Sequence, residues 1–111
     1  MKITIIGGGN IGTQCAVHCA EQKYKVTVYT SSPELYDNRL NIVDENGVTT
    51  HVGNIYLATD NPKEAFREAE IIIVTSTAMI LDNIAEIIYN YGNKNAIIGV
   101  VPDSRWKGVY I

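Results

Sequence analysis

The stretch Lys2-Ile3-Thr4-Ile5-Ile6-Gly7-Gly8-Gly9-Asn10-Ile11-Gly12 decides how this chain folds. An apolar, β-rich run at 2–6 leads directly into glycines at the first, third and sixth places of a G-x-G-x-x-G pattern. A helix-compatible segment at 10–22 and a second β-rich run at 25–30 follow. The succession of strand, glycine turn, helix and strand is typical of a unit that binds a dinucleotide.

Each position of this pattern has its own physical reason. Gly7 allows the tight turn out of the strand, Gly9 lets a pyrophosphate approach the backbone, and Gly12 lets helix and strand pack closely. Asn10 and Ile11 lie at the helix start, where unpaired N–H groups and the positive dipole end attract phosphate. The alternative is a strand-helix-strand unit whose glycines serve packing alone.

The rest of the chain continues the alternation of strands and helices. Asn46-Gly47, between β-rich runs at 41–44 and 48–51, predicts a hairpin. Asn61, Pro62 and Glu64 predict a helix start with a capping box. Further strands are expected at 54–59, 70–75 and 95–101, and helices at 61–68 and 78–91, the latter ended by Gly92.

These elements predict an α/β fold with a doubly wound, Rossmann-like parallel sheet. Right-handed crossovers place about five parallel strands in the order 3-2-1-4-5, with the hairpin inserted before the third. We expect a dinucleotide-binding domain at 1–101 and an irregular C-terminal tail at 102–111. The ligand crevice then lies over the carboxyl ends of the first and fourth strands.

The residues after the second strand bear on the choice of nucleotide. An acid usually binds the ribose 2′-hydroxyl of NAD at this point, but the chain has Thr30, Ser31 and Ser32. Their hydroxyls could donate hydrogen bonds to a 2′-phosphate, which favours NADP over NAD. Ordinary turn chemistry before a proline is an equally weighted explanation.

Hydroxyl residues also follow the fourth strand, at Thr75 and Ser76. In this topology they lie near the ribose and nicotinamide half of the cofactor. They either contact the cofactor or cap the helix that follows, and we favour capping for at least one of them.

Composition excludes several classes of protein. The chain has 111 residues, 46% of them hydrophobic, and a net charge of −3 without a basic cluster, which argues against nucleic-acid binding. The longest apolar runs fall far short of the ~20 residues that span a membrane. With a strand expected from residue 2 and no room before it for a signal peptide, we expect a cytoplasmic protein.

The cysteines and histidines do not form a recognisable metal motif. Cys15 and Cys19 are four apart on the first helix, where small side chains let the helix lie close to the sheet. No metal site is expected, because further ligands at metal-type spacing are not apparent. His18 is expected to be structural, and His51 to lie on the hairpin surface rather than to act as a base. No residue is assigned as catalytic, and no Tyr-x-x-x-Lys pair occurs.

The chain resembles the N-terminal domain of the octopine/nopaline (opine) dehydrogenase and ketopantoate reductase group. The resemblance is carried by the glycine stretch, by Val26-Thr27-Val28-Tyr29-Thr30-Ser31-Ser32-Pro33-Glu34, by the hairpin, by Ala58-Thr59-Asp60, and by the strand and turn at 71–79. It implies NAD(P)-dependent reduction of a 2-oxo acid or its imine. It also implies a second, helical domain that supplies the substrate site.

The segment Pro102-Asp103-Ser104-Arg105-Trp106-Lys107-Gly108 departs from the Pro-Gly turn of that group. With no room for a substrate domain in 111 residues, we expect a cofactor domain that is not catalytically complete alone. The alternatives are a cofactor domain alone, a truncated gene product, and a subunit that works with a separate substrate-domain chain or as a homodimer. A nucleotide-sensing regulatory domain, like those of potassium transport, is the alternative, although these usually carry an acid after the second strand. An inert fold is the third.

Overall fold

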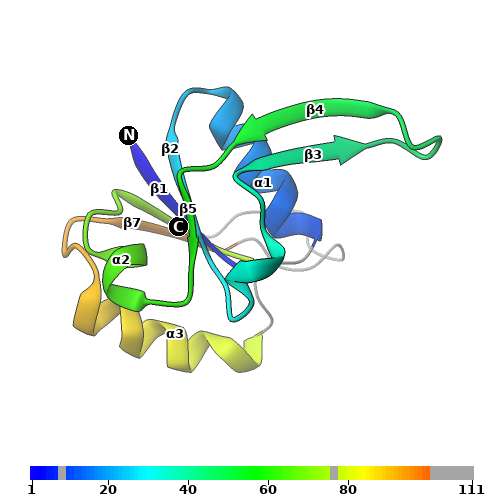
Figure 1. Ribbon diagram of the computed structural model, residues 1–111. Coiled ribbons are helices and arrows are strands. Elements are labelled where there is room, and N and C mark those ends of the chain that lie inside the picture. The colour runs from blue at the N-terminus through cyan, green and yellow to red at the C-terminus, as the bar shows by residue number, and fades with distance from the viewer. Residues whose placement is uncertain (8–9, 76–77, 101–111) are drawn as a thin grey trace.

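The computed structural model describes residues 1–7, 10–75 and 78–100, and shows strands and helices alternating along the chain (Figure 1). Its elements are β1 (Lys2–Ile6), α1 (Asn10–Glu21), β2 (Lys25–Tyr29), the 3-10 helix η1 (Pro33–Leu35), β3 (Arg39–Val43), β4 (Thr49–Asn54), β5 (Leu57–Thr59), α2 (Pro62–Phe66), β6 (Ile71–Val74), α3 (Ala78–Tyr91) and β7 (Ile97–Val100). Within these ranges no helix is long and apolar enough to cross a membrane.

Five strands form one parallel sheet, in the order β5-β2-β1-β6-β7. β1 lies at its centre, with Ile5 opposite Val28 of β2 and Ile73 of β6. The sequence-based order 3-2-1-4-5 and the Rossmann-like class are therefore confirmed. Because crossovers on both sides of β1 run in opposite directions, the carboxyl ends of β1 and β6 flank the topological switch point of the sheet.

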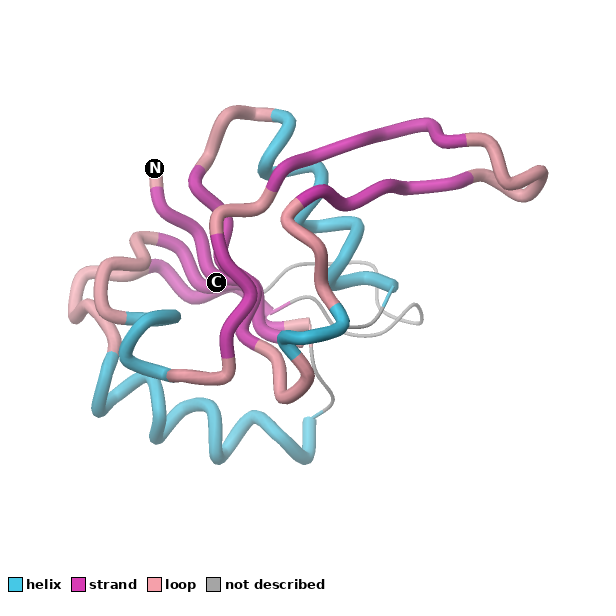
Figure 2. The backbone as a smooth tube through the Cα atoms, viewed as in Figure 1, coloured by secondary structure: helices cyan, strands magenta, loops and turns pink. Residues whose placement is uncertain are grey.

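Helices cover the sheet on both faces (Figure 2). On one face α2 and α3 pack on it, and Phe66 is completely buried among Ile6, Ile72 and Val74. On the other face lies α1, whose Ala16 is buried against the strands. Each face thus has its own apolar cluster, and the central strands β1 and β2 are buried on both sides, as is usual for parallel strands, whereas Ile97 and Ile98 of the edge strand β7 are exposed.

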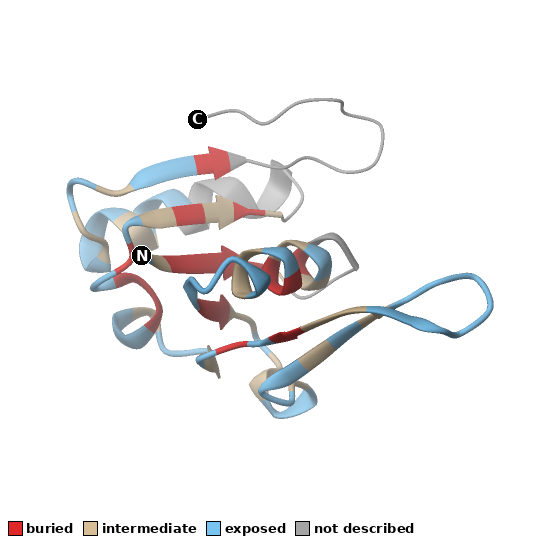
Figure 3. Cartoon of the chain, turned by 90° about the horizontal axis from the view of Figure 1, so that it is seen from above, coloured by how far each residue is buried: buried red, intermediate tan, exposed pale blue. Residues whose placement is uncertain are grey.

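The hairpin of β3 and β4 forms a separate, two-stranded antiparallel sheet beside α1. It is longer than predicted, and its far end extends away from the body with mostly exposed residues (Figure 3). The predicted Asn46-Gly47 turn is present: Gly47 has φ +78°, and the Asp44 carboxylate accepts bonds from the N–H groups of Asn46 and Val48 at 2.9 and 3.0 Å.

The start of α2 corrects one prediction. Asn61 caps the helix as expected, its side chain accepting from the N–H of Lys63 at 3.0 Å. Glu64 does not return to the backbone of Asn61, as a capping box requires. Instead the Thr59 hydroxyl accepts from the Asn61 N–H and donates to the Glu64 carboxylate. A strand-end threonine therefore mediates the contact that Glu64 was expected to make directly.

Several boundaries also differ from prediction. β2 ends one residue earlier, at Tyr29, and β5 is shorter because the predicted run 54–59 is divided between β4 and β5. The α3 helix ends before Gly92 as predicted, but Gly92 is not among the described residues with positive φ. Glycine suits this position because a Cβ would lie 2.5 Å from the carbonyl oxygen of Ile88. The predicted tail at 102–111 lies outside the described residues.

Candidate dinucleotide-binding site

The turn after β1 has the backbone geometry that the glycine pattern predicts. Gly7 has φ +108°, a left-handed conformation that favours glycine, and its N–H donates to the carbonyl of Tyr29 at 3.2 Å. A Cβ on Gly12 would overlap the carbonyl oxygen of Gly7, so the first turn of α1 lies directly against the end of β1. Two of the three glycines therefore have the mechanical roles that the pattern assigns to them, while Gly9 lies outside the described residues.

The N-terminus of α1 fits an anionic group. The helix begins at Asn10, followed by Ile11, and its first turn contains no acidic residue. The first N–H groups of a helix have no partner within it. Together with the positive end of the helix dipole, this backbone can hold a pyrophosphate without a cationic side chain.

The hydroxyls after β2 are placed at the same edge of the sheet. Thr30 is half-buried, and its Oγ1 accepts from the N–H of Ser32 at 3.2 Å, while Ser31 is exposed. This hydrogen bond is the ordinary turn chemistry before a proline that was the alternative explanation for the three hydroxyl residues. It occupies an acceptor site of Thr30 and leaves the hydroxyl proton available as a donor.

An acid that sequence reasoning missed lies beside this edge. Asp60 follows β5, the strand next to β2. Burial, and secondly the negative charge of Asp60, raise the pKa of the Tyr29 phenol above its ordinary value. The predicted strand order already contained this proximity, because it pairs the second strand with the strand before Asp60, but an acid was expected only directly after the second strand.

At the end of β6, Thr75 joins the two central strands. Its Oγ1 donates to the carbonyl of Ile6 at 2.7 Å, and its N–H donates to the same oxygen at 2.9 Å. The side chain also lies next to Gly12. Thr75 therefore links the ends of β1 and β6 at the base of the crevice. Ser76 lies outside the described residues.

The remaining predicted residues lie elsewhere. Cys15 and Cys19 are half-buried against the sheet, as expected, and burial raises the pKa of both thiols. His18 and His51, for which the sequence predicted no contact with each other, both contact the Glu21 carboxylate on the outer side of α1. A cavity of about 520 Å³ lies at the amino end of the sheet, beside Lys2 and Lys25, and so is not part of the glycine-turn crevice.

Comparisons with known proteins agree with this geometry. Residues 2–108 match the sequence model of a family described as the N-terminus of NAD-dependent glycerol-3-phosphate dehydrogenase. Over 102 residues the chain is 34% identical to glycerol-3-phosphate dehydrogenase [NAD(P)+] of Orientia tsutsugamushi (strain Boryong), covering 90% of this chain and 31% of that protein.

Solved structures share the fold at lower identity. Octopine dehydrogenase in complex with NADH and agmatine matches with a TM-score of 0.77 and 22% identity, over 91% of this chain and 28% of that one. The 2-dehydropantoate 2-reductase (ketopantoate reductase) of Methylococcus capsulatus matches with a TM-score of 0.72 and 13% identity, over 92% and 33%. The predicted resemblance to this group is confirmed, and the chain spans about a third of the length of these relatives.

Proposed function

The chain belongs to the family of N-terminal domains of NAD-dependent glycerol-3-phosphate dehydrogenases, and we propose that it binds its cofactor at the glycine turn. Domains of this family belong to oxidoreductases and bind a nicotinamide dinucleotide. The pyrophosphate lies over Gly7, Gly9 and Gly12 and is held by the N–H groups at Asn10 and Ile11. The observation that carries the proposal is the contact of Gly12 with the Gly7 carbonyl, which leaves no room for a side chain at the crevice floor.

The two ends of the cofactor extend along the edge of the sheet in opposite directions. Thr30, Ser31 and Ser32 lie at the adenosine ribose, and Thr75 and Ser76 at the nicotinamide ribose. We propose a preference for NADP, supported by three hydroxyls and no carboxylate in this turn. The charge of Asp60 near Tyr29 works in the other direction, so the preference is expected to be modest.

As part of an oxidoreductase, the domain presents the nicotinamide ring for hydride transfer to or from a substrate carbon. The family and the 34%-identical relative favour glycerol 3-phosphate and its ketone as that substrate. The 2-oxo acids and imines of the opine and ketopantoate enzymes are the second candidate, supported by the shared fold.

We expect the substrate-binding and proton-transfer groups on the part of the relatives that this chain does not cover, since it spans about a third of their length. In the described residues at the carboxyl ends of β1 and β6, Thr75 is the polar side chain, and its proton is held by the Ile6 carbonyl. A hydroxyl bonded in this way is a poor general acid or base at neutral pH.

The experiment is a paired binding and turnover assay on the 111-residue chain. We expect it to bind NADPH and NADH, yet to oxidise neither above background with dihydroxyacetone phosphate or with 2-oxo acids, with or without amino acids. Turnover with one substrate class would identify that class and contradict the proposal that the catalytic groups lie on a further domain. Absence of cofactor binding would contradict the site itself.

A further inference from the structure

The hairpin lies across α1 at a point where histidine and glutamate side chains lie close together. Gly53 of β4 lies so close to the helix that a Cβ there would meet the Val17 carbonyl oxygen at 2.9 Å and the Ala20 Cβ at 3.0 Å. Residues two apart on a strand share one face, so His51 faces the helix on the same side as Gly53. The packing of a glycine against α1 therefore brings His51 to the last turn of that helix.

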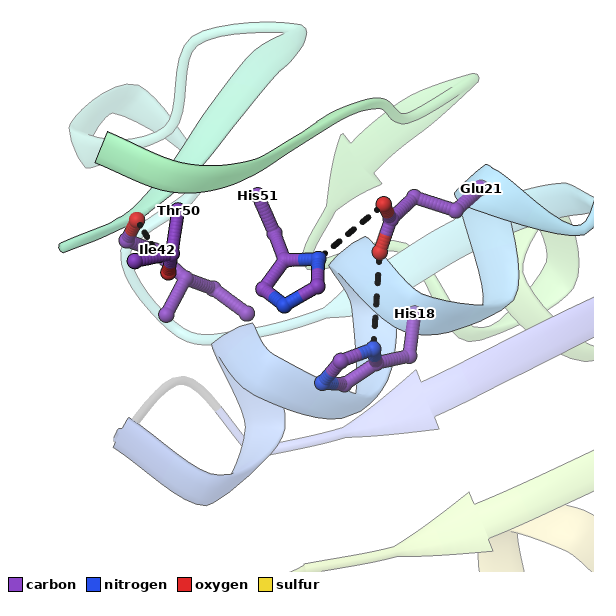
Figure 4. Close-up of polar contacts among 5 residues, drawn as sticks. All are labelled: His18, Glu21, Ile42, Thr50 and His51. Atoms are coloured by element: carbon purple, nitrogen blue, oxygen red, sulfur yellow. Dashed lines mark hydrogen bonds and ion pairs between the residues drawn. The ribbon is translucent and has the colours of Figure 1, made fainter. Parts of the chain in front are cut away.

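Three potential ligands converge there, as Figure 4 shows. The Nδ1 atom of His51 lies 3.1 Å from Glu21 Oε2, and the Nδ1 atom of His18 lies 3.4 Å from Glu21 Oε1. The two imidazole rings meet edge to face with their centroids 5.0 Å apart. One ligand atom from each residue lies within 4.8 Å of the other two.

We propose that His18, Glu21 and His51 form a binding site for a divalent transition-metal ion, with Zn²⁺ as the best match. Two imidazoles and one carboxylate are ligands that Zn²⁺ prefers, with water completing a tetrahedral shell. At Zn–ligand distances near 2.0–2.1 Å, neighbouring ligand atoms of a tetrahedron are about 3.3 Å apart. The Nδ1 atoms of His51 and His18 lie 3.1 and 3.4 Å from two different oxygens of the Glu21 carboxylate, Oε2 and Oε1. Each nitrogen is therefore already near the required separation from one oxygen, and a rotation of the carboxyl group brings a single oxygen to both.

Metal binding replaces protons at defined atoms. Each imidazole coordinates as the neutral ring through Nδ1, with its proton on Nε2, so the His51–Glu21 hydrogen bond and the His18–Glu21 ion pair are lost. The bound ion takes over the role of those two contacts. Because the neutral histidines contribute no charge, the carboxylate and Zn²⁺ together leave a net charge of +1 at the site.

The surroundings favour a cation and leave it a free coordination position. His18 and Glu21 lie in the last turn of α1, where the negative end of the helix dipole attracts positive charge. The side chains of His18 and His51 are 57% and 43% exposed, so water can reach the fourth position. The site lies on the outer side of α1, away from the glycine turn, and therefore fixes the hairpin to the helix rather than taking part in hydride transfer.

The test is calorimetric titration of the metal-free chain with ZnCl₂, together with visible spectra of the Co²⁺ complex. We expect one ion per chain and Co²⁺ absorption of a nitrogen–oxygen site, without a thiolate charge-transfer band. His51→Ala and His18→Ala should each weaken Zn²⁺ binding by about tenfold or more. Thermal unfolding should shift to higher temperature with Zn²⁺ in the wild type and not in His51→Ala.

Two matched variants make the result decisive. Glu86→Gln removes the same charge as Glu21→Gln from an exposed position on α3, and should leave Zn²⁺ affinity unchanged where Glu21→Gln lowers it. Cys15→Ser/Cys19→Ser removes the thiols on the same helix and should also leave it unchanged. No heat of Zn²⁺ binding, or binding that survives His51→Ala, or binding that the double cysteine variant abolishes, would overturn the proposal.

Discussion

Gly12 lies directly against the carbonyl oxygen of Gly7, close enough that a Cβ at Gly12 would overlap it. The contact joins the start of α1 to the end of β1 and leaves the backbone of the crevice floor uncovered. The proposed cofactor site depends on this contact more than on any side chain.

The first prediction concerns this contact. Gly12→Ala should destabilise the fold by about 1–3 kcal/mol, because the added methyl group forces the helix away from the strand, and should weaken dinucleotide binding with it. Chemical denaturation measures the first effect and calorimetry the second. Gln14→Ala, at an exposed position of the same helix, is the control and should change stability by no more than about 0.5 kcal/mol. Equal stability of Gly12→Ala and the control would show that the helix can move at no cost.

A buried hydroxyl carries the second prediction. Thr4 is 2% exposed and donates from Oγ1 to the carbonyl of Ala65, joining β1 to α2. Thr4→Val keeps the shape but leaves the carbonyl without this donor, and should cost about 1–3 kcal/mol. Thr49→Val, on the exposed end of the hairpin, is the matched control and should be nearly neutral. If the two variants unfold at the same denaturant concentration, the hydrogen bond contributes nothing.

The third prediction concerns the reactivity of the thiols. Burial raises the pKa of Cys15 and Cys19 above the ordinary value of 9.0, so the reactive thiolate forms at higher pH than in the unfolded chain. Alkylation by iodoacetamide should therefore be slow at pH 8 and accelerate only above about pH 9. The same shift destabilises the fold as pH rises above 9.0, because the unfolded thiols ionise first. A rate at pH 8 equal to that of the denatured chain would contradict this account.

Cofactor preference is the fourth prediction. We expect the wild type to bind NADPH more tightly than NADH. Thr30→Asp should favour NADH, because a carboxylate accepts from the ribose 2′-hydroxyl and repels a 2′-phosphate. A charge-assisted hydrogen bond contributes roughly 1.5–3 kcal/mol, so the ratio of affinities should change by about tenfold or more.

The structure supplies the control for this experiment. Thr30 accepts from the N–H of Ser32, and either Asp or Asn can accept the same bond, so both variants preserve the turn. Thr30→Asn adds an acceptor without charge and should move the ratio less than Thr30→Asp. Asp60→Asn should shift it towards NADPH. A wild type that prefers NADH, or a ratio that none of the variants moves, would show that this turn does not distinguish the two cofactors.

The order of the sheet could be predicted because short-range patterns determine it. The glycine turn, the β-rich run at 71–74 and the apolar stripe of α3 each identify one element, and right-handed crossovers then permit few arrangements. The close packing of Gly12 could also be predicted, since its place in the pattern has a steric cause. The hairpin followed from Asn46-Gly47, although its length did not.

Features that depend on contacts between distant segments could not be predicted. The Thr59–Glu64 contact is local in sequence, but it depends on the geometry at the point where β5 ends and α2 begins. The meeting of His51 with Glu21 requires the hairpin to dock on α1 in one register, although the spacing of His18 and Glu21 on one helix face was visible in the sequence.

The most direct test of the cofactor site is calorimetric titration of NADPH and NADH into the wild type and Gly9→Val. The branched side chain would occupy the place of the pyrophosphate, so we predict binding of both cofactors to the wild type and none to the variant. Circular dichroism and the unfolding midpoint should show that the variant keeps its fold. Equal affinities in the two proteins would contradict the assignment of the glycine turn as the dinucleotide site.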